Sequence, residues 1–159
     1  LPALPVPFPD ALIREALGQG ELTVTPLQMA LAAAIIANDG KAVTPYLVES
    51  ITAPTGAPTP YPTPPPGEAV ITIESAAGLR QAMQAAVTNG AARLSSTAPN
   101  VYGHASIAYT GATAHAWYIG FLLRPDGRIY VIAVVVEETD QAGEAARIAG
   151  TVWQSMTTP

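Results

Sequence analysis

The stretch from Ala105 to Glu138, ASIAYTGATAHAWYIGFLLRPDGRIYVIAVVVEE, decides the fold. It is rich in Ile, Val, Tyr, Trp and Phe and is interrupted by turn residues rather than helix caps, which predicts three consecutive β-strands. Between the second and third strands, the segment RPDGR at 124–128 supplies a fixed φ at its proline and a positive φ at its glycine. We therefore expect these two strands to form an antiparallel hairpin.

The second and third strands differ in their side-chain patterns. Along the second strand, large apolar residues alternate with a second set that should face the opposite side of the sheet. The first set is Trp117, Ile119, Phe121 and Leu123, and the second is Ala116, Tyr118 and Gly120. The third strand, Ile129 to Val136, is apolar throughout, which is typical of a central strand covered on both faces.

Upstream, the best-marked helix start lies at Thr25. This threonine can serve as N-cap, Pro26 occupies the first helical position, and Gln28 completes a capping box. The segment that follows is apolar nearly all round until Asn38-Asp39-Gly40 ends it. The sequence therefore predicts a helix from Pro26 to Ala37 that is buried within or behind the core.

Three more helices are expected from caps and periodicity. They run from Ala11 to Leu17 after Asp10, from Ala76 to Thr88 after Ser75, and from Gln141 to Met156 after Thr139 or Asp140. A short strand, Ala69 to Ile73, should precede the second of them. The stripes expected to face the core are Leu79, Met83 and Val87 in that helix and Ala145, Ile148, Val152 and Met156 in the last.

Two proline-rich segments favour polyproline II and cannot join the interior of a sheet. Residues 1–9 predict an extended lead-in, and residues 53–67 predict an exposed loop within a single domain that covers 10–159. The spacing of Pro62 and Pro65 also fits a P-x-x-P docking site for a proline-binding module. Plain insertion of a loop is the simpler interpretation of the same residues.

Composition excludes several classes of function. The chain has 159 residues, 49% of them hydrophobic and 12% charged, which is the composition of a globular domain. Its net charge of −5 argues against a nucleic-acid partner, and its lack of cysteine excludes disulfides and thiolate metal sites. We expect neither a metal nor a cofactor, since His104 and His115 come without a well-placed carboxylate. No apolar run approaches the roughly 20 residues of a membrane span.

Several motifs then occur in one characteristic order. They are GQGELTVTPLQMA at 18–30, GAARL at 90–94, YTGATA at 109–114, HAWYIGF at 115–121 and VVVE at 134–137. Together they resemble the C-terminal part of the transpeptidase domain of penicillin-binding proteins, in the acyl-serine peptidase and β-lactamase superfamily. The resemblance covers most of the chain after Asp10. It implies an α+β fold in which helices pack on an antiparallel sheet of three to five strands.

In that family a Lys-Thr-Gly strand binds the substrate carboxylate and donates a backbone N–H to the oxyanion hole. The corresponding candidates for a peptide groove here are Tyr109, Thr110, Gly111, Ala112 and Thr113. Tyr109 replaces the lysine, and an extra residue follows Gly111. The alternative is that these residues only form an edge strand and its turn.

The catalytic motifs of the family, Ser-x-x-Lys and Ser-x-Asn, do not occur in this sequence. Tyr109 is neutral at pH 7 and cannot replace the positive charge of the family's lysine. We therefore expect no catalytic residue in this chain and predict that it is not an enzyme by itself. Other carboxylates have structural roles, since Glu137 and Glu138 should point to opposite faces and Asp126 and Asp140 should belong to a turn and a cap.

The resemblance implies a portion of a transpeptidase-like domain at the cell envelope, in peptidoglycan synthesis and penicillin binding. Its candidate partners are a peptidoglycan stem peptide, a β-lactam or an envelope protein, and the parent protein would be membrane-anchored through a segment upstream of this chain. Two alternatives stay open. One is a stand-alone interaction module on a degenerate transpeptidase scaffold, and the other is a fragment of an active acyl-serine D,D-transpeptidase.

Overall fold

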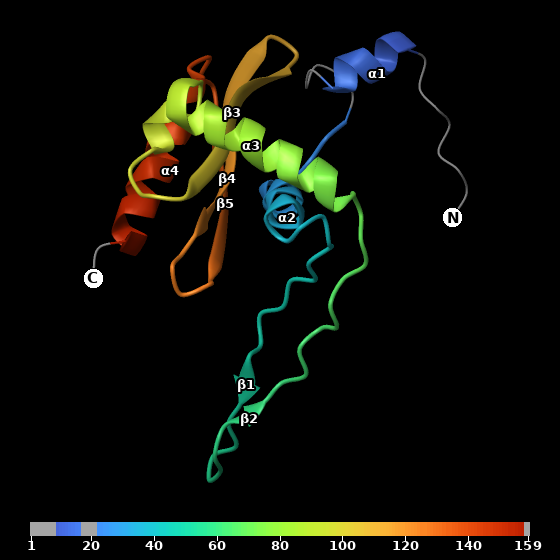
Figure 1. Cartoon of the computed structure of the whole chain (residues 1–159), viewed down its shortest axis with the longest axis vertical. Helices are drawn as coiled ribbons and strands as arrows, with labels where there is room; N and C mark the ends of the chain where they lie inside the picture. Colours follow the sequence, from blue (N-terminus) through green and yellow to red (C-terminus); the bar gives the residue numbers. More distant parts are fainter. Residues whose placement is uncertain (1–8, 17–21, 158–159) are drawn as a thin grey trace.

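The centre of the molecule is a three-stranded antiparallel sheet (Figure 1). The computed structural model describes residues 9–16 and 22–157. The strands are β3 (Val101–Thr110), β4 (Thr113–Leu123) and β5 (Ile129–Val136), and they pair in that order. Helix α4 (Ala142–Thr157) packs on one face and α2 (Pro26–Ala37) on the other. The chain is therefore an α+β domain, as the sequence predicts.

The turn predicted between the last two strands is confirmed. Gly127 has a φ of 82°, and its amide donates a hydrogen bond of 3.0 Å to the carbonyl oxygen of Arg124. The Oδ1 atom of Asp126 accepts a hydrogen bond of 3.1 Å from the amide of Arg128. The aspartate thus has the turn role expected for it.

Both faces of β4 are covered, because its side chains alternate between two apolar clusters. Tyr118 and Leu122 are buried together with Trp153 of α4. On the opposite face Phe121 is fully buried beside Ala37 of α2, and its ring stacks on that of Tyr102 with centroids 4.8 Å apart. The alternation predicted for this strand is confirmed.

The prediction that the third strand is central is wrong for the part of the chain that the structure describes. β5 lies at the edge of the sheet, with β4 on one side and no strand on the other among the described residues. Its residues from Tyr130 to Val136 are half-buried. Both faces of the strand are covered as predicted, by α2 and by α4, although only one neighbouring strand is present among the described residues.

The first strand begins earlier than expected, at Val101. Asn100, with a φ of 59°, turns the chain into the strand, and its carbonyl oxygen accepts a hydrogen bond of 3.1 Å from the amide of Leu123. The ladder with β4 therefore runs from Val101 opposite Leu122 to Thr110 opposite Thr113.

Helix α2 has the predicted bounds and the predicted capping box. The side chain of Thr25 accepts from the amide of Gln28 at 3.2 Å, and the side chain of Gln28 accepts from the amide of Thr25 at 2.8 Å. The prediction that this helix is buried is wrong, because only Ala33 and Ala37 are buried and Leu27 is 60% exposed. The helix touches β4, β5 and α3 on one side, and the described residues leave its other side uncovered.

Helix α3 (Ile73–Asn89) begins before the predicted start. Thr72, not Ser75, is the N-cap, and its side chain accepts a hydrogen bond of 3.2 Å from the amide of Ser75. The expected strand at 69–73 is reduced to one bridge between Lys41 and Ala69, because the helix already begins at Ile73.

The core stripe of α3 also differs in part from the prediction. Met83 and Val87 are buried as expected, but Leu79 is 44% exposed. Ala76 takes the third buried position. Ala76, Met83 and Val87 lie close together around the helix axis, whereas Leu79 lies at the margin of this stripe.

Helix α4 begins at Ala142, one residue later than predicted, and its predicted core stripe is right at Ala145 and Met156 but wrong at Ile148. The buried residues are Ala145, Ala146, Ala149, Gly150 and Trp153, whereas Ile148 is 37% exposed. A side chain at Gly150 would collide with the backbone of Leu94 in the short 3₁₀ helix η1 (Arg93–Ser95). The close approach of α4 to η1 thus favours small residues on the buried face of the helix. Trp153 is the one large side chain on that face.

Two segments extend away from the sheet (Figure 1). Helix α1 (Pro9–Ala16) includes Pro9, so the helix starts earlier than the expected Ala11, while Leu17 lies outside the described residues. Between α2 and α3 the chain forms a long arm closed by β1 (Ser50–Ile51) and β2 (Thr59–Pro60). Nearly all residues of 53–67 are exposed on this arm.

Among the described helices, none combines the length and the apolar composition that crossing a membrane requires.

Candidate functional site

The five groove candidates lie at the tip of the β3–β4 hairpin. Tyr109 and Thr110 end β3, Gly111 and Ala112 form the turn, and Thr113 begins β4. Gly111 has a φ of 62°, the left-handed region that favours glycine. Tyr109 is 52% exposed, and the other four residues are exposed as well. The structure therefore brings all five together at one end of the sheet.

Among the residues that the structure describes, no strand pairs with the outer edge of β3, where every second residue directs its backbone groups away from β4. The amide of Leu123 donates to the carbonyl oxygen of Asn100, which precedes β3. The carbonyl oxygen of Ala114, in contrast, accepts a hydrogen bond of 2.9 Å from the amide of Thr139, which follows β5. Odd-numbered residues of β4 therefore direct their backbone groups toward β3. By the register of the pair, Ile107 and Tyr109 direct theirs outward.

Sequence reasoning gave no groove role to the strand before Tyr109. His104 is exposed and Ser106 is half-buried, and both lie on the same face of β3 because they are two residues apart. The predicted strand began at Ala105, so His104 was treated as a flanking residue. The Asn100 turn before the strand is the local signal for the true start.

A hollow of about 600 Å³ lies beside the hairpin tip. Ala112, Thr113 and Ala114 line one side of it, and residues 138–141 line the other. Glu138 has a φ of 57°, which turns the chain sharply after β5. Glu137 and Glu138 therefore follow the strand instead of belonging to it, and both are exposed.

The two histidines lie on one face of the hairpin but at different levels. His104 is opposite Ile119, whereas His115 is opposite Ala108. The Nδ1 atom of His115 accepts a hydrogen bond of 3.4 Å from the amide of Glu138, which ties β4 to the end of β5. In the part of the chain that the structure describes, no group of three or more His, Asp or Glu residues could hold a metal ion.

Beneath the hairpin, a buried polar contact fixes β4 to α4. Trp153 donates from Nε1 to the hydroxyl of Tyr118 at 3.3 Å, and both side chains are fully buried. Burial raises the pKa of Tyr118, against the opposing effect of hydrogen bonds from Ser95 and Trp153. Trp153 thus anchors α4 in the core, while Trp117 is only half-buried.

The fold and the exposed hairpin together define a class: an α+β domain in which helices pack on both faces of an antiparallel sheet. The sequence matches the family described as "Penicillin binding protein transpeptidase domain" over residues 9–154. The chain belongs to this family.

Relatives agree with this assignment. Peptidoglycan D,D-transpeptidase PbpA of Mycolicibacterium smegmatis is 34% identical over 139 residues, which make up 84% of this chain and 28% of the relative. An imipenem acyl-enzyme complex of penicillin-binding protein A from M. tuberculosis is 29% identical with a TM-score of 0.79, and the match covers 96% of this chain and 35% of that one.

A third match has a lower sequence identity than these two. The D,D-transpeptidase domain of a peptidoglycan glycosyltransferase from Eggerthella lenta is 25% identical with a TM-score of 0.71, over 84% of this chain and 32% of that one. This chain therefore spans about a third of the solved relatives and less than a third of the curated one.

Proposed function

We propose that this chain is the sheet-bearing C-terminal portion of a transpeptidase domain in peptidoglycan synthesis, and that it binds an extended peptide along the outer edge of β3. The observation that carries the proposal is the outer edge of β3, which pairs with no strand among the described residues and ends in the exposed Tyr109 and Thr110. The family membership and the printed activity of PbpA support peptidoglycan stem peptides and β-lactams as the ligand class.

Binding would proceed by addition of a strand. The outward backbone groups of Ile107 and Tyr109 offer donors and acceptors at the spacing that an extended peptide requires. A peptide paired there would run past the exposed turn at Gly111 and Ala112 toward the hollow beside Thr113. The hydroxyl of Tyr109 would add a hydrogen-bond donor where the family has a lysine.

The same proposal assigns no acyl transfer to this chain. Its sequence holds neither Ser-x-x-Lys nor Ser-x-Asn, so no serine has a lysine one helical turn away to accept its proton. In an active parent protein, the nucleophile and its base would come from another part of the domain. The cell envelope is the location that this role requires.

The apolar β5 strand also supports the proposal that this chain is one portion of a transpeptidase domain. An uncharged edge strand of eight residues, half-buried on its faces, is suited to pairing with a further strand. The uncovered side of α2 is equally apolar. We propose that both are covered by the remainder of a transpeptidase domain.

The test is a titration of the isotope-labelled chain with a synthetic peptidoglycan stem peptide, followed through the amide NMR signals of 103–110. Saturable shifts along β3 are expected. Replacing Tyr109→Pro removes an outward N–H without touching the ladder to β4, and should weaken binding about three- to tenfold. The matched control Tyr109→Ala keeps the N–H and should bind within about twofold of wild type if backbone pairing dominates.

Two results would contradict the proposal. One is the absence of saturable shifts in a chain that unfolds cooperatively. The other is equal loss of binding in the proline and alanine variants, since that would place recognition in the phenol side chain and not in the backbone edge.

A further inference from the structure

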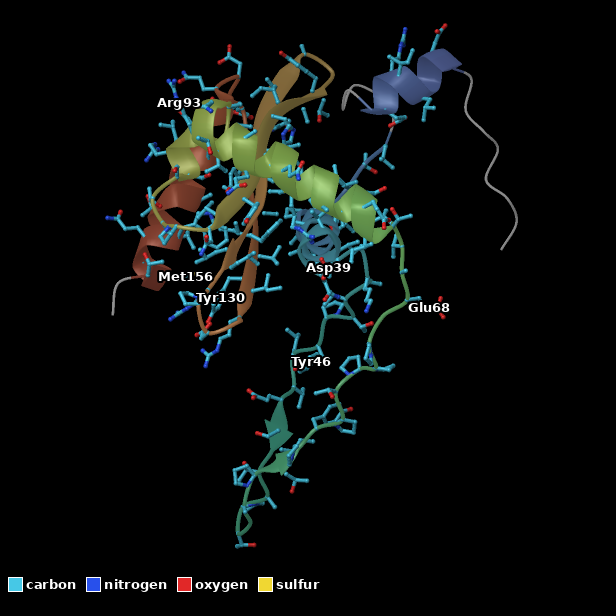
Figure 2. The ribbon with its side chains drawn as sticks, viewed as in Figure 1. Asp39, Tyr46, Glu68, Arg93, Tyr130 and Met156 are labelled. Carbon is cyan, nitrogen blue, oxygen red and sulfur yellow. The ribbon has the colours of Figure 1, made fainter. Side chains whose placement is uncertain are left out.

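One segment of the long arm between α2 and α3 has no part in the proposed function. It is the sequence YPTPPP at 61–66, which leads from β2 back toward α3, and we call it the proline leg. It contains neither helix nor strand, and it ends before the bridge between Lys41 and Ala69 that closes the base of the arm. In Figure 2, Tyr46 marks the side of the arm that leaves α2, and Glu68 marks the side that returns to α3.

Hydrogen bonds hold the arm together on both sides of the proline leg. Toward the tip, the amide of Tyr61 donates a hydrogen bond of 2.8 Å to the carbonyl oxygen of Glu49, next to the short ladder of β1 and β2. At the base, the amide of Ala42 donates a hydrogen bond of 2.9 Å to the carbonyl oxygen of Glu68. A Cβ at Gly67 would collide with the backbone of Ala42, so the two sides of the arm touch there. The proline leg is therefore held at each end and lies away from the sheet (Figure 1).

The sequence restricts the proline leg to an extended conformation. Four of its six residues are prolines, whose rings fix φ at about −65°. The other two, Tyr61 and Thr63, each precede a proline, which disfavours the helical region. All six residues are exposed except Pro64, which is half-buried. A stiff segment with these angles is close to polyproline II before any partner arrives, so binding costs little conformational entropy.

Backbone donors are almost absent from the proline leg. Its prolines have no N–H, and the amide of Tyr61 already donates to Glu49. Only the amide of Thr63 is left, and it makes no hydrogen bond within the part of the chain that the structure describes. An added β-strand would need a donor at every second residue, so this segment is unsuited to pairing with a strand. Its carbonyl groups remain acceptors, and a partner must therefore supply the donors.

The proline leg offers no charge with which a partner could pair. Between 42 and 67 the only charged residue is Glu49, which lies outside the leg. Without lysine or arginine, this part of the arm has no attraction for anionic lipid. The leg does present apolar ring surface and carbonyl oxygens, and the side chain of Tyr61, 47% exposed, adds an aromatic ring at its start.

We propose that the proline leg binds a partner protein in a groove lined by tryptophan and tyrosine side chains. Flat aromatic rings pack against the pyrrolidine rings, and the indole N–H and phenol O–H donate to the carbonyl oxygens of the leg. Polyproline II has about three residues per turn, so Pro62 and Pro65 lie on one edge of it and enter the same groove. The peptide edge at Tyr109 belongs to a different part of the fold, and this proposal does not depend on it.

The test titrates the isotope-labelled full chain with two purified modules that have such grooves, a WW domain and an SH3 domain. With at least one of them we expect saturable shifts of the amide signals of Tyr61, Thr63 and Gly67, and no shifts in α4. Pro62→Ala should weaken this binding at least about fivefold, because a ring that enters the groove is lost. Pro58→Ala, which removes an exposed proline of the same arm outside the leg, is the matched control and should bind within about twofold of wild type.

Thr63→Pro separates groove binding from strand addition. It removes the last available amide of the leg but keeps the extended conformation, so groove binding should stay within about twofold of wild type or become tighter. Loss of binding in Thr63→Pro would show instead that a strand pairs with the leg, and it would overturn the proposal.

Other results would also overturn the proposal. One is the absence of saturable shifts with both modules, and another is equal affinity of Pro62→Ala and Pro58→Ala. Shifts of Thr63 that depend on the concentration of the chain alone and vanish in Pro62→Ala would mean that a second copy of the chain occupies the leg. Because these substitutions lie on an exposed arm, the thermal unfolding midpoint should not change, which establishes that each variant is folded.

Discussion

The indole N–H of Trp153 on α4 donates a hydrogen bond of 3.3 Å to the hydroxyl of Tyr118 on β4, in a fully buried place. This contact joins the helix to the middle strand of the sheet, which pairs with β3 in the hairpin that holds the groove candidates. Gly103 and Gly120, on neighbouring strands, leave the space that the phenol occupies. The strand that pairs with the outer strand β3 is thus packed on α4 through a polar contact in the core.

Removing the hydroxyl should destabilise the domain without leaving a large cavity. In Tyr118→Phe the N–H of Trp153 loses its acceptor, which should lower the free energy of unfolding by about 1 to 3 kcal/mol. Urea denaturation followed by tryptophan fluorescence measures the change. Tyr109→Phe, at an exposed position, is the control and should change stability by less than about 0.5 kcal/mol. Equal stability of wild type and Tyr118→Phe would show that the contact contributes nothing.

The same residue predicts a loss of stability at alkaline pH. Burial raises the pKa of Tyr118 in the folded chain, whereas an unfolded tyrosine titrates near pH 10. A raised folded-state pKa stabilises fully below the unfolded value, so stability should fall as pH rises above about 10. Denaturation midpoints between pH 8 and about pH 11 test this, and the fall should be smaller in Tyr118→Phe. An identical pH profile in the two proteins would contradict the assignment.

Two glycine substitutions should have opposite signs. A Cβ at Gly103 would meet the hydroxyl of Tyr118, so Gly103→Ala should cost about 1 to 3 kcal/mol. A Cβ at Gly78 in α3 meets no atom within 4 Å, so Gly78→Ala should stabilise the helix by about 0.5 to 1 kcal/mol. Thermal unfolding of both variants under one condition decides the matter, and a gain of stability in Gly103→Ala would refute the packing described for Tyr118.

The open edge of β5 should cause self-association of the isolated chain. Eight apolar residues without a charge form a template for another strand at concentrations on the order of micromolar and above. Val135→Lys places a charge on that edge strand and should shift the sedimentation profile toward monomer. Thr59→Lys, on the exposed arm, is the control and should leave association unchanged. A monodisperse wild-type monomer at all concentrations would mean that the edge is protected.

Sequence reasoning succeeded where the signal was local. The capping box at Thr25 and the turn at Gly127 each depend on neighbouring residues, and both were predicted correctly. The bounds of β5 were also correct, because its apolar run ends at turn residues on both sides. Composition and spacing suffice for such elements, since their hydrogen bonds close within a few residues.

Features that depend on contacts between distant segments of the chain could not be predicted. The edge position of β5 follows from which strands are present beside it, not from its apolar sequence. The buried face of α4 is set by close approach at Gly150, which a stripe of larger side chains does not reveal.

The most direct test of the central claim is the intact mass of the folded chain after incubation with a reporter penicillin. The claim is that these residues offer a peptide-binding edge but supply no nucleophile. An active penicillin-binding protein in the same tube serves as positive control, and cooperative unfolding of the chain establishes that it is folded. An unchanged mass of this chain beside a labelled control is the predicted result. A mass increase by one bound penicillin would contradict the account, because a serine of this chain would then have been acylated.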